Sequence, residues 1–171
     1  MCQGANYKVP NETFVQLRSD FEEVYPNASA TSTESAMNMV FTADLLVKRI
    51  TALLQPFNLT PTSGLVLSLL ADSELPLAPN EIADRLIITR ATVTGLLDTL
   101  ERWDYVERTP HPTDRRKLLI QITDEGRQVA HDFRPVVHRH QQQWFDVLDE
   151  AEKQQLIDIL HRLQANLMDS D

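Results

Sequence analysis

Cysteine, glycine and long apolar runs are scarce in this sequence of 171 residues, and each scarcity excludes a class of protein. The single cysteine, Cys2, cannot form an internal disulfide, which favours a reducing compartment. Only four glycines occur, which disfavours a many-stranded sheet with tight turns. No apolar run approaches the roughly 20 residues of a membrane helix, and the N-terminus lacks a signal sequence. We therefore expect a soluble, largely helical, cytoplasmic protein with no membrane partner.

The sequence also lacks the motifs of a catalyst. It holds no nucleophile–base motif, no glycine-rich phosphate loop and no paired cysteines. Four histidines follow residue 130, but only His131 and His138 share a helix face, and Pro135 lies between them. We expect surface histidines, no bound metal, no cofactor and no enzymatic activity.

Charge is distributed unevenly along the chain. The formal net charge is −9, which by itself argues against a polyanionic partner. Between residues 88 and 118, however, six Lys and Arg residues stand against five Asp and Glu residues. The rest of the chain has ten basic and twenty acidic residues, so the acidic surplus lies outside the central segment.

Residues 1–32 are expected to form an extension that contains a short amphipathic helix and a polar linker. One helical stripe is formed by four apolar residues: Phe14, Leu17, Phe21 and Val24. Asn11 can cap this helix, and Pro26 ends it. Two interpretations remain open, a tail with a nascent helix or a helix whose apolar stripe docks on a partner subunit.

Helical periodicity predicts long helices on both sides of the central segment. One spans about 33–56, with Thr31 and Glu34 at capping-box spacing and apolar residues on more than one side. Helices also fill about 124–169, with a kink or break expected at Pro135. Because a helix that is apolar on two sides needs cover from two directions, we expect these helices to form the platform of a homodimer.

The region of about 60–123 has the element order of a winged helix-turn-helix. A short helix over 80–86 precedes a turn and a second helix that Thr89 can cap. Two strand-like stretches, 105–108 and 117–122, then bracket a loop that contains two prolines. The expected fold is mainly α with a small β-hairpin wing, flanked by N- and C-terminal dimerisation helices.

The outward side chains of the second helix and of the loop are candidate DNA contacts. Small hydroxyl residues at a helix N-terminus approach DNA closely, donate to phosphates and touch thymine methyls. Adjacent arginines suit a narrow minor groove, and Asp114 can hold one guanidinium in a bidentate pair. Arg108 equally suits an ordinary charge on a strand surface. The candidate DNA-binding residues are Thr89, Arg90, Thr92, Thr94, Gly95, Arg108, His111, Asp114, Arg115 and Arg116.

This central segment resembles a known family. The stretch TVTGLLDTLERWDYVERTPHPTDRRKLLIQITDEG is similar to the segment that marks MarR-type regulators, and residues 33–171 are interpreted as a MarR-type domain. The resemblance implies a homodimeric winged-helix transcription factor, usually a repressor, often released by a small aromatic or lipophilic ligand or by oxidation. By position, Arg116 matches the wing arginine that enters the minor groove, and residues 89–95 match the surface that enters the major groove.

Three residues depart from the pattern of the family. Gly95 and Thr99 stand where arginines are common, so each removes a phosphate or base contact. Gly95 in mid-helix also costs about 1 kcal/mol of helix stability. Asp104 stands at the usual glycine just past the helix, where a positive φ is often needed.

A ligand pocket is expected between the first long helix, the helix that follows it and the helix that begins near residue 124. Its expected lining is Met39, Phe41, Leu65, Ser68 and Phe133, although the same residues fit an ordinary core equally well. The favoured hypothesis is a homodimeric repressor on a pseudo-palindromic operator in double-stranded DNA, with a small-molecule effector. The alternative is a winged-helix protein-interaction or antirepressor module whose acidic surface meets a basic partner.

Overall fold

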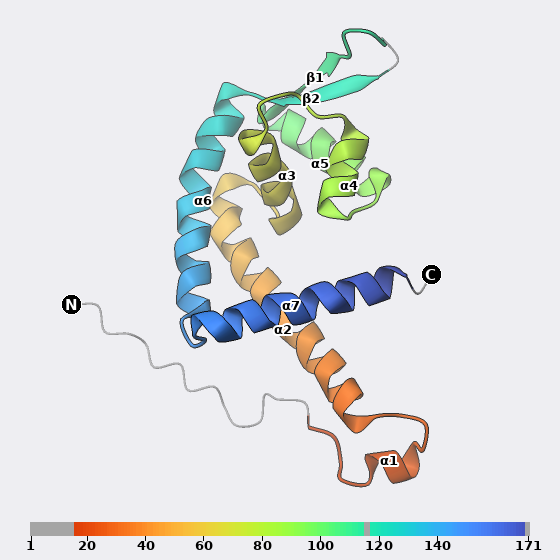
Figure 1. Ribbon diagram of the computed structural model, residues 1–171. Coiled ribbons are helices and arrows are strands. Elements are labelled where there is room, and N and C mark those ends of the chain that lie inside the picture. The colour runs from red at the N-terminus through yellow and green to blue at the C-terminus, as the bar shows by residue number, and fades with distance from the viewer. Residues whose placement is uncertain (1–15, 115–116, 170–171) are drawn as a thin grey trace, which may run out of the picture. The chain divides into compact units, whose positions relative to one another are not determined.

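The computed structural model describes residues 16–114 and 117–169 (Figure 1). The chain separates into two units, residues 1–50 and 51–171, and each is described by itself. The first unit holds α1 (Phe21–Val24) and most of α2 (Ala30–Leu54), which a 3-10 turn (Gln55–Phe57) follows. The second unit contains α3 (Pro61–Asp72), α4 (Pro79–Leu86), α5 (Arg90–Arg102), β1 (Val106–Pro110), β2 (Leu118–Ile122), α6 (Asp124–Phe145) and α7 (Glu150–Met168). This order confirms the predicted fold, mainly helical with one small hairpin. Within the described ranges no helix is both long and apolar enough to cross a membrane.

The helix α1 is shorter than the sequence predicts. It has four residues, and residues 16–20 before it are not helical. Asn11 and Phe14, the predicted cap and the first residue of the stripe, lie outside the described residues. The Leu17 N–H donates to Oε1 of Glu34 at 2.7 Å, so a carboxylate of α2 fixes the segment that precedes α1.

The helix α2 begins at Ala30, inside the predicted linker. Oγ of Ser29 accepts the N–H of Ser32 at 3.2 Å, and this cap precedes the predicted one. The predicted capping box of Thr31 and Glu34 is wrong, because both residues lie inside the helix. Among the 25 residues of α2 the only buried side chain is that of Leu54.

The core of the second unit is built by α3, α4, α5, the two strands and α6. Its largest fully buried side chains are Leu67, Ile82, Leu97, Leu100, Ile120, Val66, Val93 and Val106. Three of these, on α5, belong to the predicted apolar stripe, whose fourth member, Leu96, is half-buried. Because one face of α5 is committed to the core, its opposite face is left exposed.

The hairpin is an antiparallel pair that begins with Val106 opposite Ile122. β1 extends through Pro110, two residues beyond the predicted strand, with the proline at the strand end, where a missing N–H is tolerated. Leu77, in the segment before α4, exchanges two backbone hydrogen bonds with Ile120, at 3.0 and 2.8 Å. These bonds tie the hairpin to the helix-turn-helix.

A tight joint at the root of the hairpin links the end of α5 to the start of α6. Oγ1 of Thr123 donates to the Asp104 carbonyl at 2.6 Å and accepts the Gly126 N–H at 2.9 Å. The Thr123 N–H donates to the Tyr105 carbonyl at 3.1 Å. A Cβ on residue 126 would lie 2.0 Å from that carbonyl oxygen, so only glycine fits there.

Two helices of the second unit end on residues with left-handed backbone. After α5, Asp104 has φ 58°, as the family pattern predicts. The Tyr105 N–H donates to the Leu100 carbonyl at 2.9 Å and the Asp104 N–H to the Glu101 carbonyl at 3.0 Å, which is a Schellman motif. After α4, Ile87 has φ 54°, an unfavourable backbone conformation for a β-branched residue that the sequence analysis did not foresee.

The helix α6 continues through Pro135, so of the predicted kink or break the break is wrong, and the kink stays a prediction. The proline removes one backbone donor, but the flanking side chains Phe133 and Val137 are both buried. The ring of Phe133 meets that of Phe57 edge-on, with ring centroids 6.1 Å apart. Burial on both sides of the proline therefore holds the helix together.

We expect Asp104→Gly to raise the stability slightly, because glycine adopts a positive φ without the Cβ penalty. A gain of up to about 1 kcal/mol corresponds to a rise in Tm of about 2–4 °C. Asp104→Ala serves as the control and should lower the Tm, because alanine tolerates this conformation less well than aspartate. Thermal unfolding at one fixed protein concentration checks the order Gly above Asp above Ala; a Tm of the glycine variant below that of the wild type contradicts the turn described above.

Candidate nucleic-acid interface

An open groove of about 620 Å³ lies in the second unit between the N-terminal ends of α4 and α5 and the hairpin. Its polar lining consists of Asn80, Glu81, Arg90, Thr94, His111 and Lys117. Three of these, on α5 and at the end of β1, are predicted DNA-binding residues. The groove is open to solvent rather than enclosed, so it suits a large partner better than a small molecule held inside a cavity.

The N-terminus of α5 is capped as predicted. Oγ1 of Thr89 accepts the N–H of Thr92 at 3.1 Å, and the two hydroxyl oxygens lie 2.8 Å apart. Oγ1 of Thr94, one turn further on, donates to the Arg90 carbonyl at 3.0 Å. All four of these side chains are exposed. The first turn of α5 thus presents short side chains next to the positive end of the helix dipole, an arrangement that favours phosphate.

Gly95 is not required by the fold. A Cβ built on it meets nothing within 4 Å, and its φ is not positive. The position therefore faces open space on the exposed side of α5, in line with Thr92 and Thr94. Any side chain there would point away from the core.

The loop at the far end of the hairpin is closed by backbone hydrogen bonds. The His111 N–H donates to the Lys117 carbonyl at 3.0 Å, and the Lys117 N–H donates to the Asp114 carbonyl at 2.9 Å. Arg115 and Arg116 lie outside the described residues, so their contacts with DNA and the predicted pair with Asp114 stay predictions. Lys117 also lines the groove and was not among the predicted residues, although its place directly after the two arginines is a usable signal.

Arg108 serves the fold. Its guanidinium pairs with the Asp98 carboxylate at 2.5 Å and with the Glu101 carboxylate at 2.6 Å, and its side chain is 26% exposed. Both carboxylates belong to α5, so this double ion pair joins β1 to the helix beside it. Of the two interpretations of Arg108, the geometry supports the structural one and disfavours the predicted DNA contact.

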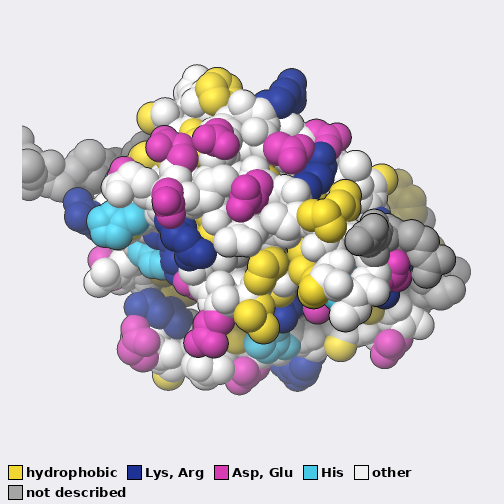
Figure 2. All heavy atoms as spheres, turned by 90° about the horizontal axis from the view of Figure 1, so that it is seen from above, with side chains coloured by type: hydrophobic (Ala, Val, Ile, Leu, Met, Phe, Trp, Pro, Cys, Tyr) yellow, Lys and Arg dark blue, Asp and Glu magenta, His cyan; other side chains and the backbone are white. Residues whose placement is uncertain are grey.

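The groove is locally richer in basic than in acidic groups. Arg90 and Lys117 stand against a single acid, Glu81, whose Oε2 accepts the Ala78 N–H at the start of α4 at 2.7 Å. Figure 2 shows acidic and basic side chains interspersed over the visible face. On this face the acidic side chains therefore do not form one continuous negatively charged patch.

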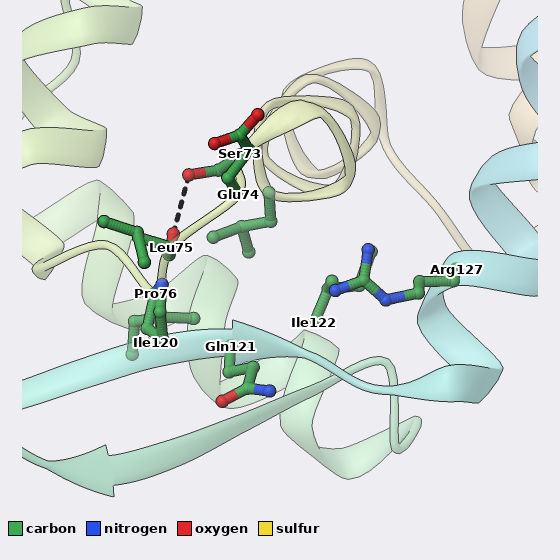
Figure 3. A pocket seen from close by; sticks show the side chains of 9 residues that line it. Ser73, Glu74, Leu75, Pro76, Ile120, Gln121, Ile122 and Arg127 are labelled. Carbon is green, nitrogen blue, oxygen red and sulfur yellow. Dashed lines mark hydrogen bonds between the residues drawn. The ribbon is translucent and has the colours of Figure 1, made fainter.

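A second hollow, close to the root of the hairpin, is too small for a ligand. It lies between the segment after α3, β2 and the start of α6, with Arg127 directed towards it (Figure 3). Oγ of Ser73 donates to the Leu75 carbonyl at 2.6 Å across its rim. Its volume of about 30 Å³ corresponds to one or two water molecules.

The five residues predicted to line a ligand pocket have different environments. Phe133 belongs to the core, Leu65 is 58% exposed and Ser68 is half-buried. Met39 and Phe41 are exposed residues of the first unit, so a pocket shared by all five stays a prediction. The two hollows described above are lined by other residues.

Comparisons with known proteins find similar transcriptional regulators. The profile of the MarR family matches residues 57–117. The HTH-type transcriptional repressor YetL of Bacillus subtilis is 44% identical over 71 residues, which cover 41% of this chain and 42% of that protein. The transcriptional repressor MprA of Escherichia coli is 26% identical over 159 residues, which cover 92% of this chain and 89% of MprA.

A solved structure adds to these sequence matches. The crystal structure of CouR from Rhodococcus jostii RHA1 bound to p-coumaroyl-CoA aligns with a TM-score of 0.70 and 25% identity, over 80% of this chain and 95% of CouR. The matched relatives are transcriptional repressors, which confirms the prediction that the chain is not an enzyme. The segment of residues 57–117, which holds the helix-turn-helix and the first strand of the hairpin, therefore resembles the MarR family.

Proposed function

We propose that this regulator is a homodimeric repressor that binds a pseudo-palindromic operator in double-stranded DNA. The observation that carries the proposal is the open groove between the two helix N-termini and the hairpin, with Arg90, His111 and Lys117 along it. Basic side chains and helix N-termini contact phosphates and set the orientation on the duplex.

In this arrangement the first half of α5 enters the major groove. Thr89, Thr92, Thr94 and Gly95 then face the base edges, and the basic groove residues Arg90 and Lys117 follow the adjacent strand of phosphates. The hairpin loop, which carries Arg115 and Arg116, extends towards the minor groove. In a twofold dimer the two copies of α5 fall in successive major grooves, about 10 base pairs apart.

The exposed apolar faces of the long helices support a homodimer. On α2, four large apolar side chains are at least half exposed: Val40, Phe41, Leu45 and Val47. No residue of α7 is buried in the described protomer, and its exposed apolar residues are Ile157, Leu163, Leu167 and Met168. Apolar surface of this extent is costly in water, and a second copy of the chain supplies the cover.

A small aromatic or lipophilic ligand is the proposed effector, and the cytoplasm, where the operator DNA lies, is the proposed compartment. CouR was solved with p-coumaroyl-CoA, an aromatic acyl thioester. On this chain Leu65 and Ser68 of α3 are accessible in the protomer, and Met39 and Phe41 of α2 are exposed. A bound ligand of this kind would favour one spacing of the two copies of α5 over another.

The proposal is tested by selecting bound fragments from genomic DNA at increasing salt concentration. We expect a pseudo-palindrome with half-sites about 10 base pairs apart. The affinity should fall linearly with salt on a double logarithmic plot. Binding without sequence selectivity even at low salt contradicts the proposal and favours the alternative, a module that binds a basic protein.

Single substitutions in the groove test which side chains meet phosphate. Arg90→Ala and Lys117→Ala should each weaken binding to all sequences and reduce the salt slope by about one. The sequence resemblance leads to the same expectation for Arg116→Ala. Arg139→Ala, which removes an exposed arginine of α6 far along the chain from the groove, is the control and should leave the slope unchanged. Unchanged operator affinity for a groove variant removes that side chain from the interface.

Gly95→Arg should add a DNA contact where the family commonly has one. The open space at this position means that the new side chain needs no repacking, and we expect a higher affinity with a salt slope steeper by about one. The control is Gly95→Ala, which should stabilise α5 by about 1 kcal/mol without changing the slope. Titration of a fluorescent operator at several salt concentrations measures both effects; equal slopes for the two variants contradict the docking of α5.

A further inference from the structure

The exposed face of α5 carries few groups that can recognise guanine. Guanine shows two acceptors in the major groove, N7 and O6, and is read by donors such as arginine and lysine. Residues 91–101 contain neither, and the outward positions of the first two turns are Ala91, Thr92, Thr94 and Gly95. The side chains that face the bases in the proposed docking are therefore small.

The hydroxyl hydrogens on this face are largely used within the helix. Oγ1 of Thr94 donates to the Arg90 carbonyl at 3.0 Å, and Oγ1 of Thr99 donates to the Gly95 carbonyl at 3.0 Å. Thr89 and Thr92 share one hydrogen between oxygens 2.8 Å apart, which leaves one free donor at the very start of the helix, where phosphate is favoured. A threonine whose hydroxyl is turned back to the helix offers a methyl group and lone pairs outward.

The one long donor at this end of α5 faces the hairpin side. Arg90 shares the groove with His111 and Lys117, where the phosphate strand runs in the proposed docking. It is therefore assigned to the backbone of the DNA, which carries no sequence information directly. What remains for the bases is a surface of methyl groups and acceptors.

We propose that α5 reads the C5-methyl groups of thymine, so that the base pairs it contacts are A·T pairs; this inference rests on the proposed operator binding. Methyl groups of Ala91, Thr92 and Thr94 make apolar contacts with the thymine methyl, and the threonine lone pairs accept from the N6 amino group of adenine.

The experiment uses the full chain and the operator obtained by fragment selection. Synthetic duplexes replace the half-site thymines one at a time by deoxyuridine, which deletes only the methyl group. We expect about fourfold weaker binding for each contacted methyl, the effect of removing one methyl-sized group from a buried contact. Replacing half-site guanines by 7-deazaguanine, which removes the N7 acceptor, should leave the affinity unchanged.

A matched pair of variants assigns the effect to the methyl of the protein. Thr94→Val keeps a methyl and removes the hydroxyl, so the penalty for deoxyuridine should persist at the position that residue 94 contacts. Thr94→Ser keeps the hydroxyl and removes the methyl, so thymine and deoxyuridine should bind equally there. The coupling between the two changes is read as a double-mutant cycle.

The outcomes separate this inference from the proposed function. Sequence-selective binding that ignores deoxyuridine but weakens tenfold or more with 7-deazaguanine overturns methyl reading and leaves the repressor intact. The inference is also overturned if replacing thymine by deoxyuridine weakens binding equally in the wild type, Thr94→Ser and Thr92→Ser. In that case the threonine methyl groups of α5 do not contact the thymine methyl groups. Absence of any sequence-selective binding overturns the proposed function and the inference together.

Discussion

The close approach of α6 to the Tyr105 carbonyl is the constraint on which the helix-turn-helix and its hairpin depend. That oxygen accepts the Thr123 N–H, and it lies where a Cβ on residue 126 would otherwise be. Through Thr123, the same joint holds the Asp104 carbonyl and caps α6. A few hydrogen bonds thus fix the end of α5 and the start of α6 to the two strands. Because the joint is made by backbone groups and short side chains, it leaves little freedom between α5 and the hairpin.

The charge distribution fits the proposed DNA docking better than the total suggests. Two of the five acids between residues 88 and 118, Asp98 and Glu101, are paired with Arg108. Arg108 therefore does two things, since it joins β1 to α5 and screens carboxylates that would otherwise repel phosphate. The positive groups left for the groove are Arg90 and Lys117, together with the helix N-termini. A chain with a net charge of −9 can accordingly present a DNA-binding edge of the opposite sign.

Local signals in the sequence predicted the helix-turn-helix well, and long-range contacts account for what they missed. The cap at Thr89 and the apolar stripe of α5 follow from side-chain chemistry a few residues apart, whereas the left-handed residue at Asp104 was expected from the resemblance to the family. The partners of Arg108 lie seven and ten residues away on another element, so spacing alone left its role open. The helix α2 begins early because Ser29 caps it, although the spacing of Thr31 and Glu34 had favoured a capping box further along the chain. Pro135 stays helical because tertiary burial outweighs one lost hydrogen bond.

The open space around Gly95 bears on how such a regulator changes its targets. One face of α5 packs in the core, and the opposite face is exposed to solvent. The residues proposed to contact the operator therefore contribute little to the stability of the fold. Substitutions on the outward face alter recognition at little cost in stability, whereas those on the inward face would be removed by selection first. New binding preferences can then arise by single steps on an unchanged scaffold, and duplicated copies of the gene can diverge in the promoters they control while keeping the same architecture.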